Sequence, residues 1–379
     1  MERDKSNRTI TFITPTLDRK GSEIALINLL QQINPAFQVK LIAKYKGVLF
    51  DSILPLIKKI FLFNGKPNRT YFSRIKARLE IRKNISSVLS KERKSVFYIN
   101  TIVLPDILAY AEKKGISSIV HIHELEQMYV QLNDKQIKRL VSYPELIIAN
   151  SQASAKVIEN YGRKKFLEIC YPSLETRKIK PDEKKYIEYR NKLNINSNEF
   201  LWVMSGSLDK NKNPFLFIEI AVEMLKRKPN TRFLWIGGTT DKEFEMECLN
   251  RATANSVSDK IIWSGDVGED YYSYFNCADG FVLTSVKESF SMVTVEALLY
   301  GLPVVTQNCG GVSEILGMDI GKIVDSKNNS VLMANEMIKF MEGTYKVDKE
   351  KQKIRAKEFD AEKVGKHWNE ILERYFNRT

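Results

Sequence analysis

The feature that most constrains the fold of this 379-residue chain is an alternation of apolar runs and polar loops over residues 280–314. Residues 281–283 have the length of a buried parallel strand, and a polar loop carrying Glu288 follows them. Residues 292–300 are rich in apolar side chains and stop at a glycine, as helices commonly do. A second apolar run at 302–305 and a Gly-Gly pair come next. This pattern predicts a β-loop-α-β unit.

Two carboxylates in this unit, Glu288 and Glu296, have seven residues between them. The first N–H groups of the predicted helix, around Ser291, Met292 and Val293, lack intrahelical partners, and together with the helix dipole they favour a phosphate or diphosphate. Carboxylates beside such a site suit hydroxyl groups, because each accepts two hydrogen bonds from a vicinal diol. The arrangement predicts a site for a sugar nucleotide: a sugar, a diphosphate and a ribose.

The sequence ESFSMVTVE, followed by EALLYGLPVV and GGVSEIL, resembles the donor-site signature of family 4 retaining glycosyltransferases of the GT-B fold. The alternative is an ordinary βαβ unit in which Glu288 is solvated and Glu296 has a capping role. This interpretation is weaker, because the spacing of the two glutamates, the flanking strand and the trailing Gly-Gly-x-x-Glu all agree with the family signature. The resemblance implies that Glu288 contacts hydroxyls of the transferred sugar and that Glu296 holds the ribose. Further donor contacts would come from Ser289, Phe290, Ser291, Met292 and Val293. The family usually has glycine where Ser291 stands, which predicts a less close approach of the backbone to the phosphates.

The same resemblance adds donor contacts from two other turns. In the family, the turn after the strand at 200–206 holds an arginine and a lysine that clamp the diphosphate. Lys212 matches the lysine, but Ser207 takes the place of the arginine, and Lys210 is a candidate substitute. The strand that begins at residue 260 ends at Gly265, where the family's backbone contacts the nucleotide base, and Val267 is expected to pack on that base.

Two segments of the first half complete the candidate site. Gly21 lies between a predicted strand at 9–13 and a helix, where it would let the backbone approach a bound group closely. The resemblance gives this glycine loop a place against the donor phosphates. A predicted strand at 118–124 contains His121 and His123, which point the same way on an extended chain. The resemblance favours His123 as the residue near the diphosphate or sugar, and with Lys212 and Glu288 it forms the catalytic set.

The order of the elements predicts an α/β protein, and the resemblance specifies GT-B: two Rossmann-like doubly wound domains facing each other across a cleft. Residues 1–174 would form the acceptor-binding domain and 195–360 the donor-binding domain, with 175–194 as a linker. A single terminal helix is predicted over 349–376, and its end, within 361–379, is expected to pack back on the first domain.

Composition limits the cellular setting. The start of the chain is polar, without the apolar run of a signal peptide, and no window reaches the ~18 apolar residues of a membrane span. Four cysteines are scattered without CxxC spacing, which indicates a reducing cytoplasm, no disulfide frame and no zinc site. The chain has no Asp-x-Asp pair, so a metal-bound diphosphate is disfavoured. We therefore expect neither a metal nor a cofactor.

The formal net charge of +13 is a large positive excess that needs an explanation, such as an anionic binding partner. Residues 51–94 hold twelve Lys or Arg against three Asp or Glu, interleaved with bulky apolar side chains. Such a stretch is typical of a contact with an anionic membrane surface, although a solvated helix face explains it equally well. Nucleic acid is disfavoured, because the chain has no basic-aromatic repeats and no finger motif. The expected location is the cytoplasm, peripheral at the inner face of the membrane.

The predicted activity is transfer of a hexosyl group, with retention and without a metal, from a UDP- or GDP-sugar to an acceptor hydroxyl. The acceptor would be a glycan or lipid-linked glycan, in the biosynthesis of cell-surface polysaccharide, lipopolysaccharide or another glycan. Two alternatives remain: a sugar-nucleotide epimerase or hydrolase of the same fold, and a catalytically inactive binding module. A dehydrogenase is excluded, since no G-x-G-x-x-G follows any predicted strand.

Overall fold

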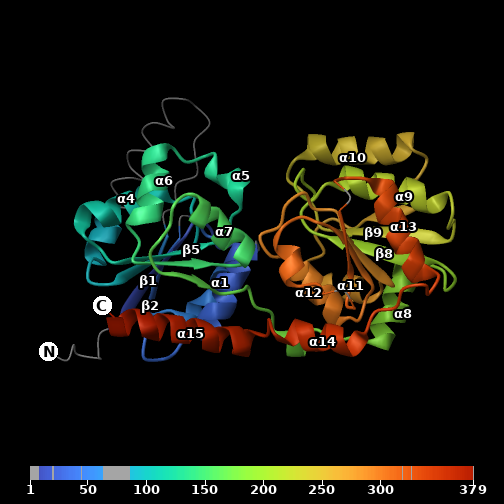
Figure 1. Cartoon of the computed structure of the whole chain (residues 1–379). Coiled ribbons are helices and arrows are strands. Elements are labelled where there is room, and N and C mark those ends of the chain that lie inside the picture. The colour runs from blue at the N-terminus through green and yellow to red at the C-terminus, as the bar shows by residue number, and fades with distance from the viewer. Residues whose placement is uncertain are drawn as a thin grey trace. The chain divides into compact units, whose positions relative to one another are not determined.

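The computed structural model describes residues 8–18, 21–43, 45–62, 86–317, 319–325 and 327–378. The chain divides into two compact units, each built around one parallel sheet (Figure 1). The first unit is Met1–Leu174 with Ala361–Thr379, and the second is Glu175–Asp360. The two sheets establish the doubly wound α/β class that the sequence predicts.

The first unit contains a seven-stranded sheet in the order β3-β2-β1-β4-β5-β6-β7, with every neighbouring pair parallel. Its central strands are buried along almost their whole length because both of their faces are covered. The strands are β1 (Thr9–Thr14), β2 (Gln38–Ala43), β3 (Lys59–Leu62), β4 (Val96–Ile99), β5 (Ser118–Ile122), β6 (Leu146–Ala149) and β7 (Leu167–Ile169).

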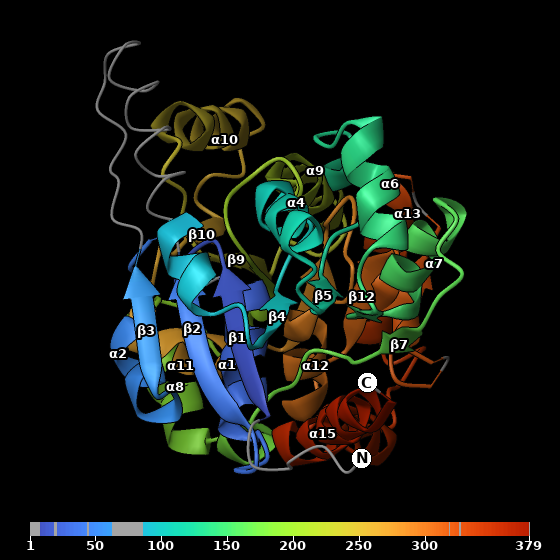
Figure 2. The same ribbon diagram turned by 90° about the vertical axis from the view of Figure 1, so that its left-hand side faces the viewer.

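Alternate residues of these strands enter two hydrophobic clusters, one on each face of the sheet. One cluster includes α1 and α15, and the other includes α4, α6 and α7. Figure 2 shows α15 and the pair α4 and α6 on opposite sides of this sheet. The helices are α1 (Gly21–Gln31), α2 (Phe50–Ile53), η2 (Leu54–Leu56), α4 (Pro105–Lys114), α5 (Glu126–Tyr129), α6 (Asp134–Ser142), α7 (Gln152–Asn160) and α15 (Ala361–Arg378).

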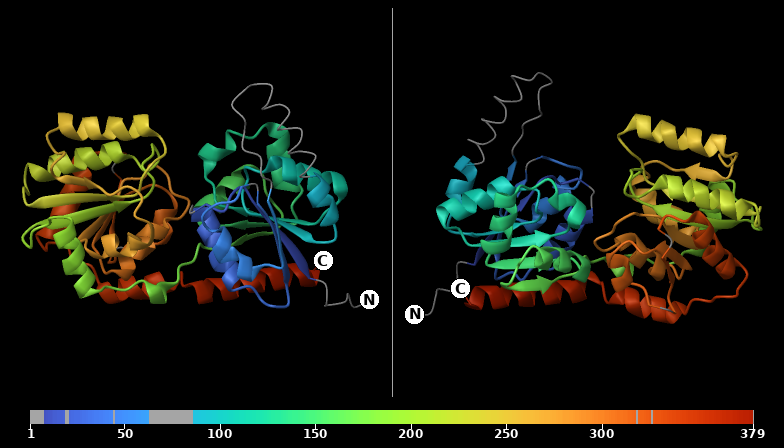
Figure 3. Two further views of the ribbon diagram at one scale, coloured as in Figure 1. Left: turned by 180° about the vertical axis from the view of Figure 1, so that it is seen from behind. Right: turned by 45° about the horizontal axis from the view of Figure 1, so that its top comes forward.

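The C-terminal helix α15 is part of the first unit and runs beside α1 (Figure 3). Trp368 of α15 is fully buried, with its ring centroid 6.0 Å from that of Phe12 and 5.9 Å from that of Tyr98. Its indole N–H donates a hydrogen bond of 3.0 Å to the Tyr98 hydroxyl. A large apolar ring and a satisfied polar group thus tie the last helix to the sheet.

The second unit contains a six-stranded parallel sheet in the order β10-β9-β8-β11-β12-β13. The strands are β8 (Phe200–Ser205), β9 (Thr231–Ile236), β10 (Ile261–Trp263), β11 (Gly280–Leu283), β12 (Val304–Gln307) and β13 (Lys322–Val324). Figure 1 shows α9, α10 and α13 on one face of this sheet and α11 and α12 on the other. The helices are η3 (Thr176–Lys178), α8 (Glu183–Lys192), α9 (Pro214–Leu225), α10 (Lys242–Ala254), η4 (Gly268–Asp270), α11 (Tyr271–Asn276), α12 (Met292–Leu299), η5 (Gly311–Glu314), α13 (Ser330–Met341) and α14 (Lys349–Lys357).

Two expectations require correction. The single helix predicted over 349–376 is two helices, α14 and α15, because the chain turns at Phe359 and Asp360. Phe359 is buried with its ring 5.0 Å from that of Phe290, and the Asp360 carboxylate accepts a hydrogen bond from Thr176. The stretch 175–194, predicted as a surface linker with a short helix, does contain a short helix, α8, but it is part of the second unit.

Among the described residues, no helix is both long enough and apolar enough to span a bilayer. All four cysteines are described, and each is buried with a free thiol.

Replacing Trp368 with alanine is expected to destabilise the first unit by roughly 3–5 kcal/mol, because loss of a fully buried indole leaves a cavity and removes one of the two hydrogen-bond partners of the Tyr98 hydroxyl. Urea unfolding followed by circular dichroism measures this loss. The exposed Lys366, also on α15, provides a control, since Lys366→Ala removes no buried contact. An equal midpoint for Trp368→Ala and the wild type would contradict the role given to this helix.

Candidate functional site

The candidate site of the second unit lies where the strand order of its sheet reverses. From β8 the chain proceeds to β9 on one side, and from β11 it proceeds to β12 on the other. Open α/β sheets bind ligands beside the carboxyl ends of strands at such a switch point. The loop after β8 carries Lys212, and the loop after β11 carries Glu288. Topology therefore brings the loops of these two predicted residues together.

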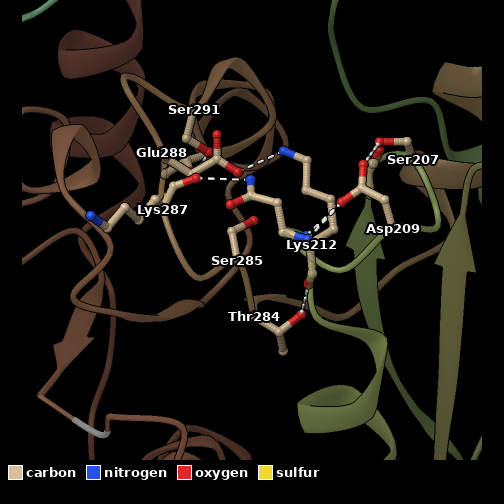
Figure 4. Close-up of polar contacts among 12 residues, drawn as sticks. Ser207, Asp209, Lys212, Thr284, Ser285, Lys287, Glu288 and Ser291 are labelled. Atoms are coloured by element: carbon tan, nitrogen blue, oxygen red, sulfur yellow. Dashed lines mark hydrogen bonds and ion pairs between the residues drawn. The ribbon is translucent and has the colours of Figure 1, made fainter. Parts of the chain in front are cut away.

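Lys212 and Glu288 form an ion pair, with 2.6 Å between the Lys212 Nζ and the Glu288 Oε1 (Figure 4). The side chains are 20% and 12% exposed, so both are shielded from water yet accessible. The Asp209 carboxylate accepts the backbone N–H of Lys212 at 2.9 Å, and the Thr284 hydroxyl donates to the Lys212 carbonyl at 2.7 Å. Lys212 is thus positioned through its backbone by groups from both loops.

The backbone of Glu288 is held as firmly as that of its partner. Its N–H donates to the Cys309 carbonyl at 2.7 Å, and its carbonyl accepts the N–H of Gly311 at 2.8 Å. A Cβ at position 311 would lie 2.0 Å from the carbonyl oxygen of Ser289, which no side chain can tolerate. Gly311 is therefore required for the loop after β12 to support the loop that carries Glu288.

The start of α12 has an unusual backbone conformation. Ser291 precedes the helix with φ 120° and ψ 79°, a conformation that favours glycine and costs a serine about 1–3 kcal/mol. This conformation gives a physical reason for the glycine usual in the resembled family. The Ser291 hydroxyl lies 2.8 Å from the Thr294 hydroxyl, and no side chain caps the helix within the described part of the chain. The Thr294 N–H donates to the Ser291 carbonyl at 3.1 Å, so the amides of Met292 and Val293 are the first-turn candidates for an anion.

The other predicted residues of this segment differ in exposure. Ser289, Met292 and Val293 are half-buried at the start of α12. Phe290 is buried, and its ring packs on Phe359 in the core of the unit. The side chain of Phe290 therefore supports the loop, and only its backbone is suited to a ligand contact.

Glu296 lies in α12 and is only 6% exposed. Its Oε2 accepts a hydrogen bond of 2.6 Å from the Tyr271 hydroxyl, and its Oε1 accepts one of 3.3 Å from the Tyr272 hydroxyl. Burial, opposed only in part by these two bonds, raises the pKa of Glu296 to about 7. The second carboxylate of the motif thus has phenols as partners, whereas the first has a lysine.

The remaining predicted residues of the second unit lie along the same edge of the sheet. Ser207 is exposed, and its hydroxyl donates to the Asp209 carboxylate at 2.5 Å; Lys210 is exposed. Gly265 follows β10 with φ 66°, a left-handed conformation suited to glycine, and Val267 beyond it is half-buried.

In the first unit, Asn100 connects the predicted residue His123 to the segment that follows the predicted residue Gly21. The Nε2 of His123 lies 2.9 Å from the Asn100 Oδ1, and the Asn100 Nδ2 donates to the Ser22 carbonyl at 3.2 Å. Ser22 follows Gly21 at the start of α1. Gly21 is exposed, and a Cβ there would meet nothing within 4 Å, so the protein itself does not require glycine at this position.

The two histidines of β5 and its exit do point the same way, with ring centroids 4.2 Å apart. His121 is buried, with its Nδ1 2.8 Å from the Tyr98 hydroxyl, as expected of a packed strand residue. Burial lowers the pKa of His123 to about 3, so its imidazole is neutral near pH 7. A neutral His123 can donate or accept a hydrogen bond but carries no charge for a phosphate.

Three residues of these networks were missed by the sequence analysis: Asn100, Tyr271 and Tyr272. Asn100 directly follows β4, and a polar side chain at a strand exit is the signal that could have found it. The adjacent tyrosines follow the predicted base-contacting loop, but only the fold brings them to Glu296. Within the described part of the chain, no group of three or more His, Cys, Asp or Glu side chains could hold a metal ion.

Comparison with known proteins places this site in a family context. Residues 185–358 match the family model of glycosyl transferases group 1, within the second unit. D-inositol 3-phosphate glycosyltransferase of Segniliparus rotundus is 25% identical over 194 residues, which are 50% of this chain and 42% of that protein. UDP-Gal:alpha-D-GlcNAc-diphosphoundecaprenol alpha-1,3-galactosyltransferase of Escherichia coli is 24% identical over 302 residues, or 73% of each chain. The chain spans less than half the length of the first curated relatives it matches.

Among solved structures, HepE of Anabaena in complex with UDP and glucose is similar in fold, with a TM-score of 0.81 and 19% identity. The similarity covers 96% of this chain and 99% of that one. These findings confirm the predicted two-domain α/β GT-B fold.

Glu296→Gln is expected to stabilise the protein at alkaline pH. The folded-state pKa of about 7 lies above the usual 4.5, so the stability that protonated Glu296 contributes is complete below about pH 4.5 and is lost as the pH rises to about 7. At pH 8 the amide avoids this cost, which is up to about 3 kcal/mol. Urea unfolding at pH 5 and pH 8 measures the difference, with the exposed Glu247→Gln as the control. If the gain in stability of Glu296→Gln over the wild type is no larger at pH 8 than at pH 5, the buried environment assigned to Glu296 would be contradicted.

Proposed function

We propose that this chain is a family 4 retaining glycosyltransferase, which transfers a hexosyl group from a nucleoside diphosphate sugar to an acceptor hydroxyl. The observation that carries the proposal is the Lys212–Glu288 ion pair beside the uncapped start of α12. A cation and a set of free amides suit a diphosphate, and the adjacent carboxylate suits sugar hydroxyls.

In this proposal each charged group contacts one part of the donor. The diphosphate lies against Lys212 and the first-turn amides of α12, Glu288 accepts hydrogen bonds from hydroxyls of the transferred sugar, and Glu296 accepts them from the ribose. The Lys212 ammonium moves from Glu288 toward the phosphate when the donor arrives. Gly265 and Val267 receive the base.

The proposed chemistry depends on stabilisation of the leaving group. As the glycosidic bond breaks, negative charge grows on the diphosphate, and the Lys212 ammonium with the α12 amides offsets it. The acceptor hydroxyl attacks the anomeric carbon from the face that the diphosphate leaves, and the leaving phosphate takes the hydroxyl proton, so the sugar is transferred with retention and no protein nucleophile is needed. We propose that no metal takes part, because the lysine and the helix dipole supply the positive charge.

For the nucleotide we propose UDP. HepE was solved with UDP and glucose, and the similar galactosyltransferase of Escherichia coli is named for UDP-Gal. That enzyme is also named for a diphosphoundecaprenol-linked acceptor, which supports a lipid-linked glycan as the acceptor here. Such a substrate would place the chain at the inner face of the membrane, in glycan biosynthesis.

The basic stretch 51–94 is the proposed membrane contact. In its described part, Leu54 is 42% exposed, and Lys58 and Lys59 are exposed. Residues 63–85, which make up the greater part of this stretch, lie outside the residues that the structure describes. Exposed lysines beside an apolar side chain suit anionic lipid headgroups.

Thermal-shift measurements with UDP, GDP, ADP and their sugars test the donor, and transfer to a lipid-linked glycan with and without EDTA tests the reaction. Release of free sugar in the presence of acceptor would indicate a hydrolase, and nucleotide binding without turnover would indicate a binding module. No shift with any sugar nucleotide would overturn the proposal.

Substitutions of the three charged residues are expected to give different kinetic profiles. Lys212→Ala should lower kcat by about 100- to 1000-fold, because it removes a charge that stabilises the leaving group. Glu288→Ala should mainly slow turnover, whereas Glu296→Ala should mainly raise the Kd for the nucleotide. Steady-state kinetics and calorimetry separate these effects. Identical profiles for the two glutamate variants would contradict the assigned roles.

Reversing the charge of Lys58 and Lys59 is expected to reduce sedimentation with anionic vesicles, by about 1 kcal/mol of binding per lysine. The double variant Lys113→Glu, Lys114→Glu, on the exposed end of α4, makes the same change in net charge at another surface. Unchanged sedimentation of the Lys58, Lys59 variant, or an equal loss in the control, would reject the membrane contact.

A further inference from the structure

Two neighbouring tyrosines at the start of α11 share the carboxylate of Glu296. Tyr271 contacts the Oε2 at 2.6 Å, and Tyr272 contacts the Oε1 at 3.3 Å. The two rings meet edge to face, with centroids 5.1 Å apart. They are successive in the sequence and bind the same group, yet their surroundings differ.

Tyr271 is fixed from two sides. Its hydroxyl lies 2.9 Å from the Ser205 hydroxyl in addition to its short bond to Glu296. Because Tyr271 gives its single proton to the carboxylate, Ser205 must be the donor in the second bond. Moving this ring would break both bonds, so Tyr271 is a permanent part of the Glu296 environment.

Tyr272 is held weakly at its ring and firmly at its backbone. Its side chain is 36% exposed, and a hydrogen bond of 3.3 Å lies beyond the usual range for two oxygen atoms. The Tyr300 hydroxyl donates to the Tyr272 carbonyl at 3.2 Å and so ties the main chain in place. The ring can therefore leave the carboxylate by a change of rotamer, without movement of α11.

We infer that the Tyr272 hydroxyl competes with a ribose hydroxyl of the nucleotide for one oxygen of Glu296, so that Tyr272 is displaced when the nucleotide binds. The inference rests on the proposed function, in which Glu296 holds the ribose. Glu296 is nearly inaccessible in the observed arrangement, so the ribose reaches it only when Tyr272 turns away. A nucleotide able to replace the lost hydrogen bond is favoured over one that lacks the ribose hydroxyls.

This exchange lowers the apparent affinity of every ligand for the site, because only the fraction of molecules with Tyr272 displaced is competent to bind. Removing the hydroxyl while keeping the ring should remove that penalty. Tyr272→Phe is thus expected to tighten binding, unlike most substitutions in a binding site. A ring that served as a stacking platform for the base would be indifferent to the same change.

The test uses calorimetry with the full chain and whichever of UDP, GDP and ADP binds the wild type best, together with the 2′,3′-dideoxy form of that nucleotide. Tyr272→Phe should lower the Kd of the ribonucleotide about five-fold, the value of one modest hydrogen bond. The ratio of the Kd of the dideoxy form to that of the ribonucleotide should be at least as large in Tyr272→Phe as in the wild type. Tyr271→Phe is the matched control, and it should give no tightening because Tyr272 still covers the carboxylate.

The outcomes separate the inference from the proposal beneath it. An unchanged or higher Kd in Tyr272→Phe, with normal binding by the wild type, overturns the inference alone. A smaller ratio of the dideoxy Kd to the ribonucleotide Kd in Tyr272→Phe than in the wild type also overturns it. So does an equal fall of the ribonucleotide Kd in Tyr271→Phe. If the folded wild type binds none of the three nucleotides, the proposed function itself is overturned.

Discussion

The packing of the loops after β8, β11 and β12 around the Lys212–Glu288 ion pair is the constraint on which the candidate site depends. A charge pair shielded from water is stable only where its geometry is held by other contacts. Here the backbone of each partner is fixed: Lys212 by Asp209 and Thr284, and Glu288 by Cys309 and Gly311. The pair therefore reports on the packing of three loops, those after β8, β11 and β12, at the point where the strand order reverses.

The two glutamates of the motif lie in opposite electrostatic environments, although they belong to one β-loop-α segment. Glu288 has a cationic partner, whereas Glu296 is buried among phenol hydroxyls that have no formal charge. Burial disfavours the ionised form of Glu296, and its hydrogen bonds compensate only in part. A carboxylate in that state gains from additional hydroxyl donors, which is the physical basis for a role in binding a ribose.

The first unit is organised around a chain of polar groups inside an apolar core. The Trp368 indole donates to the Tyr98 hydroxyl, and this hydroxyl contacts His121, whose ring lies against that of His123. His123 in turn contacts Asn100, which reaches the start of α1. The C-terminal helix is thus linked by successive contacts to the exits of β4 and β5, so its packing contributes to the position of His123.

The sequence by itself determined the α/β class and the β-loop-α-β unit, because apolar periodicity is a local property, and its motif spacing singled out Lys212, Glu288 and Glu296 as candidates. Other features depend on residues distant in the chain. The break between α14 and α15 follows from the contact of Phe359 with Phe290, and the surroundings of Glu296 follow from Tyr271 and Tyr272, which precede it by more than twenty residues. Asn100 similarly gains its role from the pairing of β4 with β5. Only the tertiary structure decided these points, because burial, pKa and hydrogen-bond partners arise from packing between segments that no local pattern relates.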